Sequence, residues 1–230
     1  MEVDEKHNMK LSLDELAYLV AFVGGTTLRG IQYSFNQSNE SELRQHFELI
    51  QQKLENKDIL HVNFDGTVQM SQDVHDMIST IAFCNRVILQ QTNGSEEAIS
   101  YQYYLYGELI LELQLEEDQC ILHPMHAIYE LNATMIERSG ILQHYDFGQQ
   151  GNIQDLSTAE IEKNISSFCS VQCCHLENEQ ISAEREVSYI TSERKLYQIK
   201  VEQELEDSLS SYSFKPVTLQ WVVHEINQIL

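Results

Sequence analysis

Apolar residues recur at helical spacing in three segments of the N-terminal part of the chain. A first helix is predicted over residues 13–23, because Ser12 and Glu15 form the pattern of a capping box. Two more helices are predicted after the serine caps Ser41 and Ser71. Their apolar faces consist of Leu43, Phe47, Ile50 and Leu54 in one helix and of Val74, Ile78, Ile81 and Ala82 in the other.

The hydrophobic period then changes from that of a helix to that of a strand. Strands are predicted at 86–91, 98–106, 108–115 and 119–123. A short strand pair around Asp65-Gly66 precedes them, Asn93-Gly94 marks a tight hairpin, and Pro124 is expected to end the last strand. Because Leu109, Leu111, Leu113 and Leu115 fall on one face and the other face includes Glu112 and Gln114, we expect an antiparallel meander with one buried face.

The second half of the chain repeats this order of elements more faintly. A helix at 128–139 is followed by a predicted boundary loop from Gly148 to Gly151. A helix at 157–168 is then expected to bury Ile161, Ile165 and Phe168. Strands are predicted at 186–191, 194–202 and 209–214, with a last helix after Pro216 that runs to Leu230. The predicted fold class is therefore α+β, as a single domain over 1–230 with pseudo-repeat halves of about 1–147 and 148–230.

The charge balance excludes some kinds of partner. The chain has 230 residues and a formal net charge of −22, with 36 acidic and 14 basic residues. Binding to nucleic acid or to an anionic membrane surface needs clustered lysine and arginine, which this sequence lacks. No signal peptide and no apolar run of the length that spans a bilayer is evident, so we expect no membrane insertion and a cytoplasmic location.

Two groups of cysteine and histidine residues have metal-ligating side chains at short spacing. The first contains Cys120, His123 and His126, and the second contains Cys169, Cys173, Cys174 and His175. Neither has the second ligand pair of a structural zinc site, so buried reduced thiols and surface histidines are the simpler interpretation, and metal binding stays open. No phosphate-binding loop, nucleophile elbow or metalloprotease helix occurs. We therefore expect no cofactor, no metal, no catalytic residues and no enzymatic activity.

Four tyrosines are concentrated in one predicted strand. They are Tyr101, Tyr103, Tyr104 and Tyr106. Tyrosines at such positions either pack in the core against neighbouring strands or form an exposed aromatic recognition surface. The first interpretation is favoured.

The order of several short motifs resembles that of the EspG family, the cytosolic chaperones of ESX (type VII) secretion. The opening Leu11-Ser12-Leu13-Asp14-Glu15-Leu16 is similar to the Leu-x-Leu-Asp-Glu-Leu start of that family. Leu54 at a helix end, Asp65-Gly66-Thr67-Val68 before a helix, the strand Arg86-Val87-Ile88-Leu89 and a C-terminal helix follow in the family's order. The linker after Gly25 lacks the prolines usual in mycobacterial members, which favours a relative from a low-G+C Gram-positive (Firmicutes-type) bacterium.

This resemblance implies a pseudo-twofold α+β fold in which two helical groups flank a central antiparallel sheet. It also implies a partner, a helical secreted protein or heterodimer of a type VII secretion system, whose apolar tip is shielded until export. Family contacts come from a loop between sheet strands and from the C-terminal helical group. By position these correspond to Gln91, Asn93, Gly94, Glu96 and Glu97, and to Gln220, His224 and Gln228.

An acidic immunity or inhibitor protein that neutralises a toxin is the alternative function. Such a protein would use aspartate and glutamate on a sheet face to bind a basic partner. Its binding should weaken sharply with ionic strength, whereas the shielding of an apolar tip should not.

Overall fold

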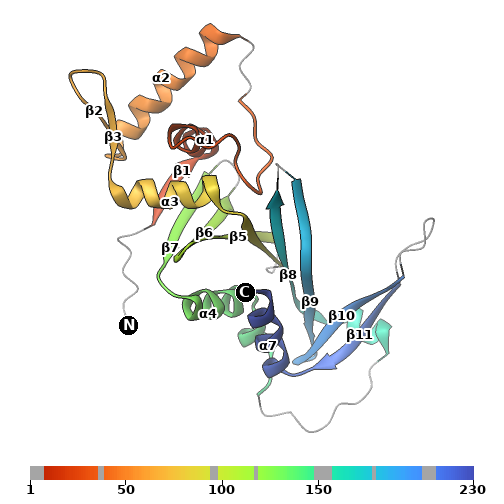
Figure 1. The fold of residues 1–230 in the computed structure, drawn as a ribbon. Helices are drawn as coiled ribbons and strands as arrows, with labels where there is room; N and C mark the ends of the chain where they lie inside the picture. Colours follow the sequence, from red (N-terminus) through yellow and green to blue (C-terminus); the bar gives the residue numbers. More distant parts are fainter. Residues whose placement is uncertain are drawn as a thin grey trace. The chain divides into compact units, whose positions relative to one another are not determined.

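An antiparallel sheet and a set of short helices make up the computed structural model (Figure 1). The structure describes residues 8–35, 39–93, 98–116, 119–147, 157–177, 180–203 and 211–230. In the first part of the chain the elements are β1 (Met9–Ser12), α1 (Leu13–Phe22), α2 (Glu40–Asn56), β2 (Leu60–Val62), β3 (Val68–Met70), α3 (Gln72–Phe83), β4 (Arg86–Asn93), β5 (Ala98–Tyr106), β6 (Leu109–Glu116) and β7 (Gln119–Met125). They are followed by α4 (Ile128–Arg138), α5 (Ile141–His144), α6 (Thr158–Lys163), β8 (Ile165–Glu177), β9 (Gln180–Ser192), β10 (Lys195–Gln203), β11 (Ser211–Val217) and α7 (Leu219–Ile229).

The strand order confirms the predicted α+β class and the predicted meander. Within the described ranges the large sheet has nine strands in the order β1-β7-β6-β5-β4-β8-β9-β10-β11, and β2 pairs with β3 separately. Strands β4 to β7 are neighbours in sequence order, as tight connections between antiparallel strands require. Between β6 and β7 the register places Leu113 opposite Leu122.

The chain divides into two compact units made of interleaved segments. The first unit comprises Met1–Val87, Gln102–Ala127 and His175–Ser182, and the second comprises Ile88–Tyr101, Ile128–Cys174 and Ala183–Leu230. The pseudo-repeat halves of about 1–147 and 148–230 stay a prediction. The boundary loop from Gly148 to Gly151 lies outside the described residues.

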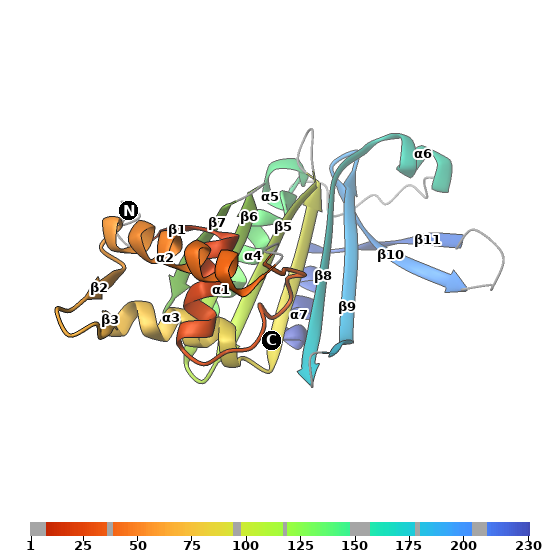
Figure 2. The same cartoon turned by 90° about the horizontal axis from the view of Figure 1, so that it is seen from above.

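In the first unit, α1 and α3 cover one face of the strands β6 and β7 (Figures 1 and 2). The side chains that meet there are fully buried; they include Leu16, Leu19, Ile78, Ile81, Leu113 and Leu122. The predicted capping box of α1 is confirmed, since the Ser12 hydroxyl oxygen accepts a hydrogen bond from the Glu15 amide at 3.2 Å. The Glu15 carboxylate in turn accepts one from the Ser12 amide at 2.7 Å.

The capping carboxylate of Glu15 also forms a partly buried ion pair. Its side chain is only 4% exposed, and its Oε2 atom lies 2.7 Å from the Nζ atom of Lys57, the residue that follows α2. Lys57 Nζ also donates to the backbone carbonyl of Lys10 in β1, at 3.3 Å. One buried charge thus connects β1, the start of α1 and the end of α2.

The predicted cap of α2 is wrong by two residues, whereas that of α3 is right. The Oδ1 atom of Asn39 accepts a hydrogen bond from the Glu42 amide at 3.0 Å, so Asn39 is the cap and Ser41 lies in the first turn. Asparagine and serine are comparably good caps, and the pattern alone did not distinguish them. Ser71 caps α3 by accepting from the Val74 amide.

Strands β6 and β7 depart from two expectations. Strand β7 continues through Pro124, which lies opposite Leu111, because β1 pairs with β7 only up to Leu122. Beyond that point β7 has a free edge among the described strands, where a proline removes no sheet hydrogen bond. The single buried face predicted for β6 is also wrong, since Glu112 is 3% exposed while Leu109 is 43% exposed.

In the second unit, α4 and α7 lie side by side (Figure 1). Asn132 of α4 donates from Nδ2 to Oδ1 of Asn227 in α7, at 2.6 Å. The buried face of α7 consists of Val222, Ile226 and Ile229, which confirms the predicted C-terminal helix. That helix begins after the cap Thr218, two residues later than Pro216. Pro216 lies in β11, the last strand of the sheet order, where an edge tolerates it.

The helix predicted at 157–168 is the largest error of the sequence analysis. Ser157 caps a helix as expected, but α6 ends at Lys163 and the long strand β8 starts at Ile165. From Ser167 to Cys173 every second residue of β8 is buried, namely Ser167, Cys169, Val171 and Cys173. Small side chains at these positions hide the period of a strand, whereas Ile161, Ile165 and Phe168 happen to match helical spacing. Ile165 is in fact 45% exposed.

We predict that Lys57→Met lowers the free energy of unfolding by about 2–4 kcal/mol, because it leaves the buried Glu15 carboxylate without its counter-ion. Chemical denaturation followed by circular dichroism measures the change. Lys53→Met is the matched control, since Lys53 is an exposed lysine in the last turn of the same helix. Equal stability of the two variants would contradict a structural role for the ion pair.

Candidate functional site

The exposed face of α7 carries three of the predicted partner-binding residues. Gln220, His224 and Gln228 are all exposed, and their spacing of four residues places them along one side of the helix. Arg185 of β9 anchors that helix, because its Nη2 atom lies 2.9 Å from Oε2 of Glu225. Its Nη1 atom also donates to the backbone carbonyl of Gln228, at 3.4 Å. The structure thus assembles this part of the predicted site on one anchored surface.

The end of β4 carries two more of the predicted residues. Gln91 and Asn93 are exposed, whereas the alternating residues Gln90 and Thr92 are buried. The Nε2 atom of Gln90 donates to the carbonyl of Met135 in α4 at 2.7 Å and to Sγ of Cys169 in β8 at 3.4 Å, which holds the strand in place. The remaining predicted residues, Gly94, Glu96 and Glu97, lie outside the described residues. The assignment of this loop and of the α7 face to partner binding stays a prediction.

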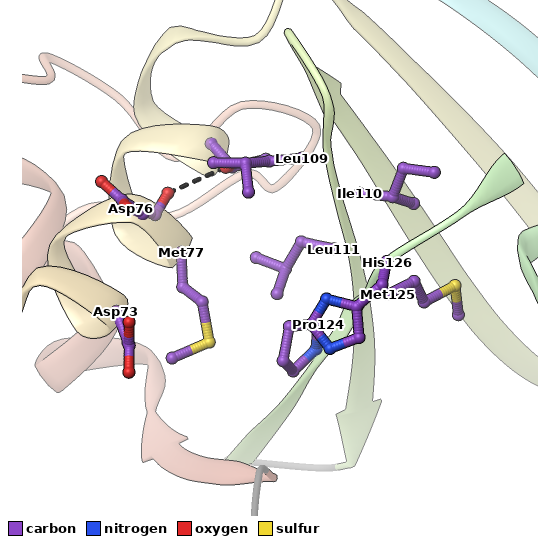
Figure 3. A pocket seen from close by; sticks show the side chains of 10 residues that line it. Asp73, Asp76, Met77, Leu109, Ile110, Leu111, Pro124, Met125 and His126 are labelled. Atoms are coloured by element: carbon purple, nitrogen blue, oxygen red, sulfur yellow. Dashed lines mark hydrogen bonds between the residues drawn. The ribbon is translucent and has the colours of Figure 1, made fainter.

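A small pocket in the first unit lies between α3 and the strands β6 and β7 (Figure 3). It has a volume of about 230 Å³. Its lining is apolar on the side of the strands and acidic on the side of the helix; it comprises Asp73, Asp76, Met77, Thr80, Leu109, Ile110, Leu111, Pro124, Met125 and His126. The dashed line in the figure marks the hydrogen bond of 2.8 Å from Thr80 Oγ1 to the backbone carbonyl of Asp76. Such a lining suits one aliphatic side chain that ends in a positive charge.

A larger apolar groove lies in the second unit, across α6 and the strands β8 to β11. It has a volume of about 650 Å³. The groove is lined by Glu162, Ile165, Phe168, Glu186, Ser188, Ile190, Ile199, Tyr212 and Phe214. The sequence analysis missed it, because the helix expected at 157–168 would have buried Ile165 and Phe168. The alternation of Tyr212, Phe214 and Pro216 with polar residues is the pattern that could have revealed it.

The tyrosines of β5 belong mainly to the core. Tyr101, Tyr103 and Tyr104 are at most 5% exposed, and Tyr106 is 45% exposed. The hydroxyl of Tyr104 lies 2.8 Å from the backbone carbonyl of Arg29 and 2.6 Å from Oε1 of Gln102. Burial raises the pKa of Tyr104 well above its usual value, so the hydroxyl stays a hydrogen-bond donor.

The five cysteines are free and buried. Burial raises the pKa of the Cys84 thiol to about 11, that of Cys120 to about 12 and that of Cys169 to about 11. Burial, followed by the neighbouring Cys173, also raises the pKa of Cys174. In the first predicted metal group, the Cys120 thiol donates to the Leu11 carbonyl at 3.3 Å and His123 Nδ1 lies 2.6 Å from Oδ1 of Asn8. Over the described residues, no three histidine, cysteine, aspartate or glutamate side chains are grouped so as to hold a metal ion.

The described part of the chain contains no helix that is both long enough and apolar enough to cross a membrane.

Comparison with known proteins identifies the fold but no sequence relative. No protein-family model matches the sequence. No curated protein is significantly similar to it in sequence. Among solved structures, the fold is similar to that of the Mycobacterium tuberculosis type VII secretion system chaperone EspG5, solved in complex with the PE25–PPE41 dimer. The TM-score is 0.59, the sequence identity is 9%, and the likeness covers 96% of this chain and 95% of the chaperone.

The chain therefore has an EspG-like fold, as the motif order predicted. The structural similarity establishes the architecture of the chain. At so low a sequence identity, its function has to be inferred separately. The expected Gram-positive origin stays a prediction.

We predict that Cys84, Cys120 and Cys169 of the native protein react with a thiol reagent at pH 8 at least about a hundredfold more slowly than in the unfolded chain. A thiol with a pKa near 11 is about one part in a thousand ionised at that pH, and burial adds steric protection. Mass spectrometry of timed alkylation, with the guanidinium-unfolded protein as the control, measures the rates. An increase in the labelling of Cys169, Cys173 and Cys174 after a chelator is added would instead reveal a bound metal.

Proposed function

We propose that this protein is a non-enzymatic chaperone or adaptor that binds helical-hairpin substrates of a type VII (ESX) secretion system. It shields their apolar tip and keeps them soluble until export. The observation that carries this proposal is the likeness of fold to a type VII secretion chaperone over nearly the full length of both chains. Likeness over a whole chain supports a shared role more strongly than likeness over one common motif would.

The exposed polar side chains of the predicted site support this proposal. A chaperone must release its substrate at the secretion machinery, so its interface should be modest in size and moderate in affinity. The α7 face supplies polar side chains on a helix whose own apolar side is buried. Gln91 and Asn93 at the end of β4 extend this set, together with the predicted loop residues Gly94, Glu96 and Glu97. In this proposal, they surround the apolar tip of the partner.

The acidic composition supports a second candidate, an inhibitor that neutralises a basic toxin. A net charge of −22 would attract such a partner over a long range at low salt. Salt distinguishes the two candidates. An inhibitor should bind at least about tenfold more weakly when the ionic strength rises from roughly 0.1 M to 0.5 M, whereas the shielding of an apolar tip should change little.

We predict that the tagged protein, isolated from its native cell, carries small secreted proteins with a helical-hairpin structure. Replacing Gln220, His224 and Gln228 together by alanine should weaken binding of one such purified substrate at least about tenfold, because interface contacts are lost while the exposed positions leave the fold intact. Isothermal titration measures the affinity, and light scattering measures aggregation of the substrate.

The first unit offers a matched control for this experiment. Gln45, Gln52 and His61 are also two glutamines and one histidine, and all three are exposed. Their triple alanine variant should bind as the wild type does. Failure to recover any helical secreted protein would contradict the proposed function. Normal binding by the α7 variant would contradict the assigned surface alone.

A further inference from the structure

The face of the sheet that carries most of the large apolar side chains changes between the neighbouring strands β9 and β10. In β8 and β9 most of the buried side chains occupy one face; they include Cys169, Val171, Val187 and Tyr189, whereas Ile190 of β9 is buried on the opposite face. The opposite face of these two strands carries Ser170, Ser188 and Glu186, which are joined by hydrogen bonds of 3.0 Å. In β10 and β11 most of the large apolar side chains lie on that opposite face instead, with Leu196 as an exception. The register pairs Tyr197 with Ile190 of β9 and Ile199 with Phe214 of β11.

Helix α6 covers only part of the apolar surface that results from this reversal. Its Ile161 forms a buried cluster with Ile190 and Tyr197. Phe168, Ile199 and Phe214 pack against the cluster and are only partly buried. Farther from the cluster, Ile165 is 45% exposed and Tyr212 is 54% exposed. The groove between these residues is an apolar surface that the described part of the second unit leaves open. Exposed apolar surface of this kind is typical of an interaction site.

The charge of the groove has a single sign. Its lining includes Glu162 of α6 and Glu186 of β9, and no lysine or arginine among the described residues. Both carboxylates lie on exposed residues, so they border the apolar floor without burying a charge. A partner that placed large apolar side chains on the floor would bind more tightly if lysine or arginine beside them faced the two carboxylates.

We propose that this groove binds an amphipathic helix of a partner protein, with large apolar side chains on one face and lysine or arginine along the borders of that face. Strands β8, β9 and β10 under the groove each have a neighbouring strand on both sides, and β11 is the edge among the described strands, so an extended peptide lying across the floor could add only side-chain contacts there. The floor residues come from four neighbouring strands, and the register pairs β9 with β10 from Lys195 to Gln198. A helix, which is about 10–12 Å across with its side chains, can contact side chains from several of these strands at once.

Helix α6 shows within the chain how such a helix is held. It lies on the same face, contributes one isoleucine to the floor and keeps Glu160 and Glu162 at the surface. A partner helix would continue this packing over Ile199, Phe214 and Tyr212. The groove is separate from Gln220, His224 and Gln228, and its chemistry does not depend on which secretion system supplies the partner.

A synthetic peptide tests the proposal. The probe is a fluorescent helix of about 20 residues, long enough to be helical alone, with leucine and isoleucine on one face and lysine along its borders. Fluorescence anisotropy should show saturable binding to the full chain. Tyr212→Ser and Ile165→Ser should each weaken that binding at least about tenfold, and Glu162→Gln should reduce its dependence on salt.

The matched control is Tyr129→Ser, since Tyr129 is a tyrosine of the same unit, 76% exposed on α4 and outside the groove. This variant should bind the probe as the wild type does. Because Tyr212 and Ile165 are exposed, thermal unfolding midpoints should be nearly equal for all variants.

Several outcomes would overturn the proposal. They are an absence of binding at millimolar peptide, equal weakening by Tyr129→Ser and Tyr212→Ser, or equal affinity for a peptide whose lysines are replaced by glutamates. Sedimentation velocity provides a further test. A concentration-dependent dimer that Tyr212→Ser dissociates would assign the groove to a second copy of the chain and exclude the helix partner.

Discussion

The burial of both faces of an antiparallel sheet is the constraint on which this structure depends. Every strand directs alternate side chains to opposite faces, so each apolar face needs a cover. In the first unit, α1 and α3 supply that cover for β6 and β7. The ion pair between Glu15 and Lys57 connects this helical layer to β1 and α2. In the second unit, Gln90 joins α4 to β8, and Arg185 joins β9 to α7.

The same constraint explains where the chain remains open to a partner. Helix α6 has only six residues and buries one isoleucine, so it cannot cover the apolar face of β10 and β11. What it leaves uncovered is the groove bordered by Glu162 and Glu186. An exposed apolar surface of this kind lowers the solubility of a protein, and the large negative charge of the chain acts in the opposite direction.

Local physical chemistry accounts for the parts of the fold that could be predicted from sequence. The Ser12–Glu15 capping box, the Ser71 cap and the strand Ala98–Tyr106 depend on residues close together in the chain, and the structure confirms each of them. The errors occur where a distant element decides the outcome. Pro124 remains in β7 because β1 stops pairing at Leu122, and Glu112 is buried although its strand alternates regularly. The candidate site rests on the resemblance of motif order and stays a prediction, since no catalytic or ligand-binding motif marks Gln220, His224 or Gln228.

The sequence by itself determined the class of fold, the caps of α1 and α3 and the apolar face of α7, because these depend on periodicity and on hydrogen bonds between near neighbours. Only the tertiary structure decided that residues 165–177 form a strand, since small serine and cysteine side chains at its buried positions carry too weak a hydrophobic period. It also decided that Ile165, Phe168, Ile199, Tyr212 and Phe214 meet in one groove. The strand register brings these residues together, and the short length of α6 leaves them uncovered. Neither property is encoded in the local sequence pattern around any one of them.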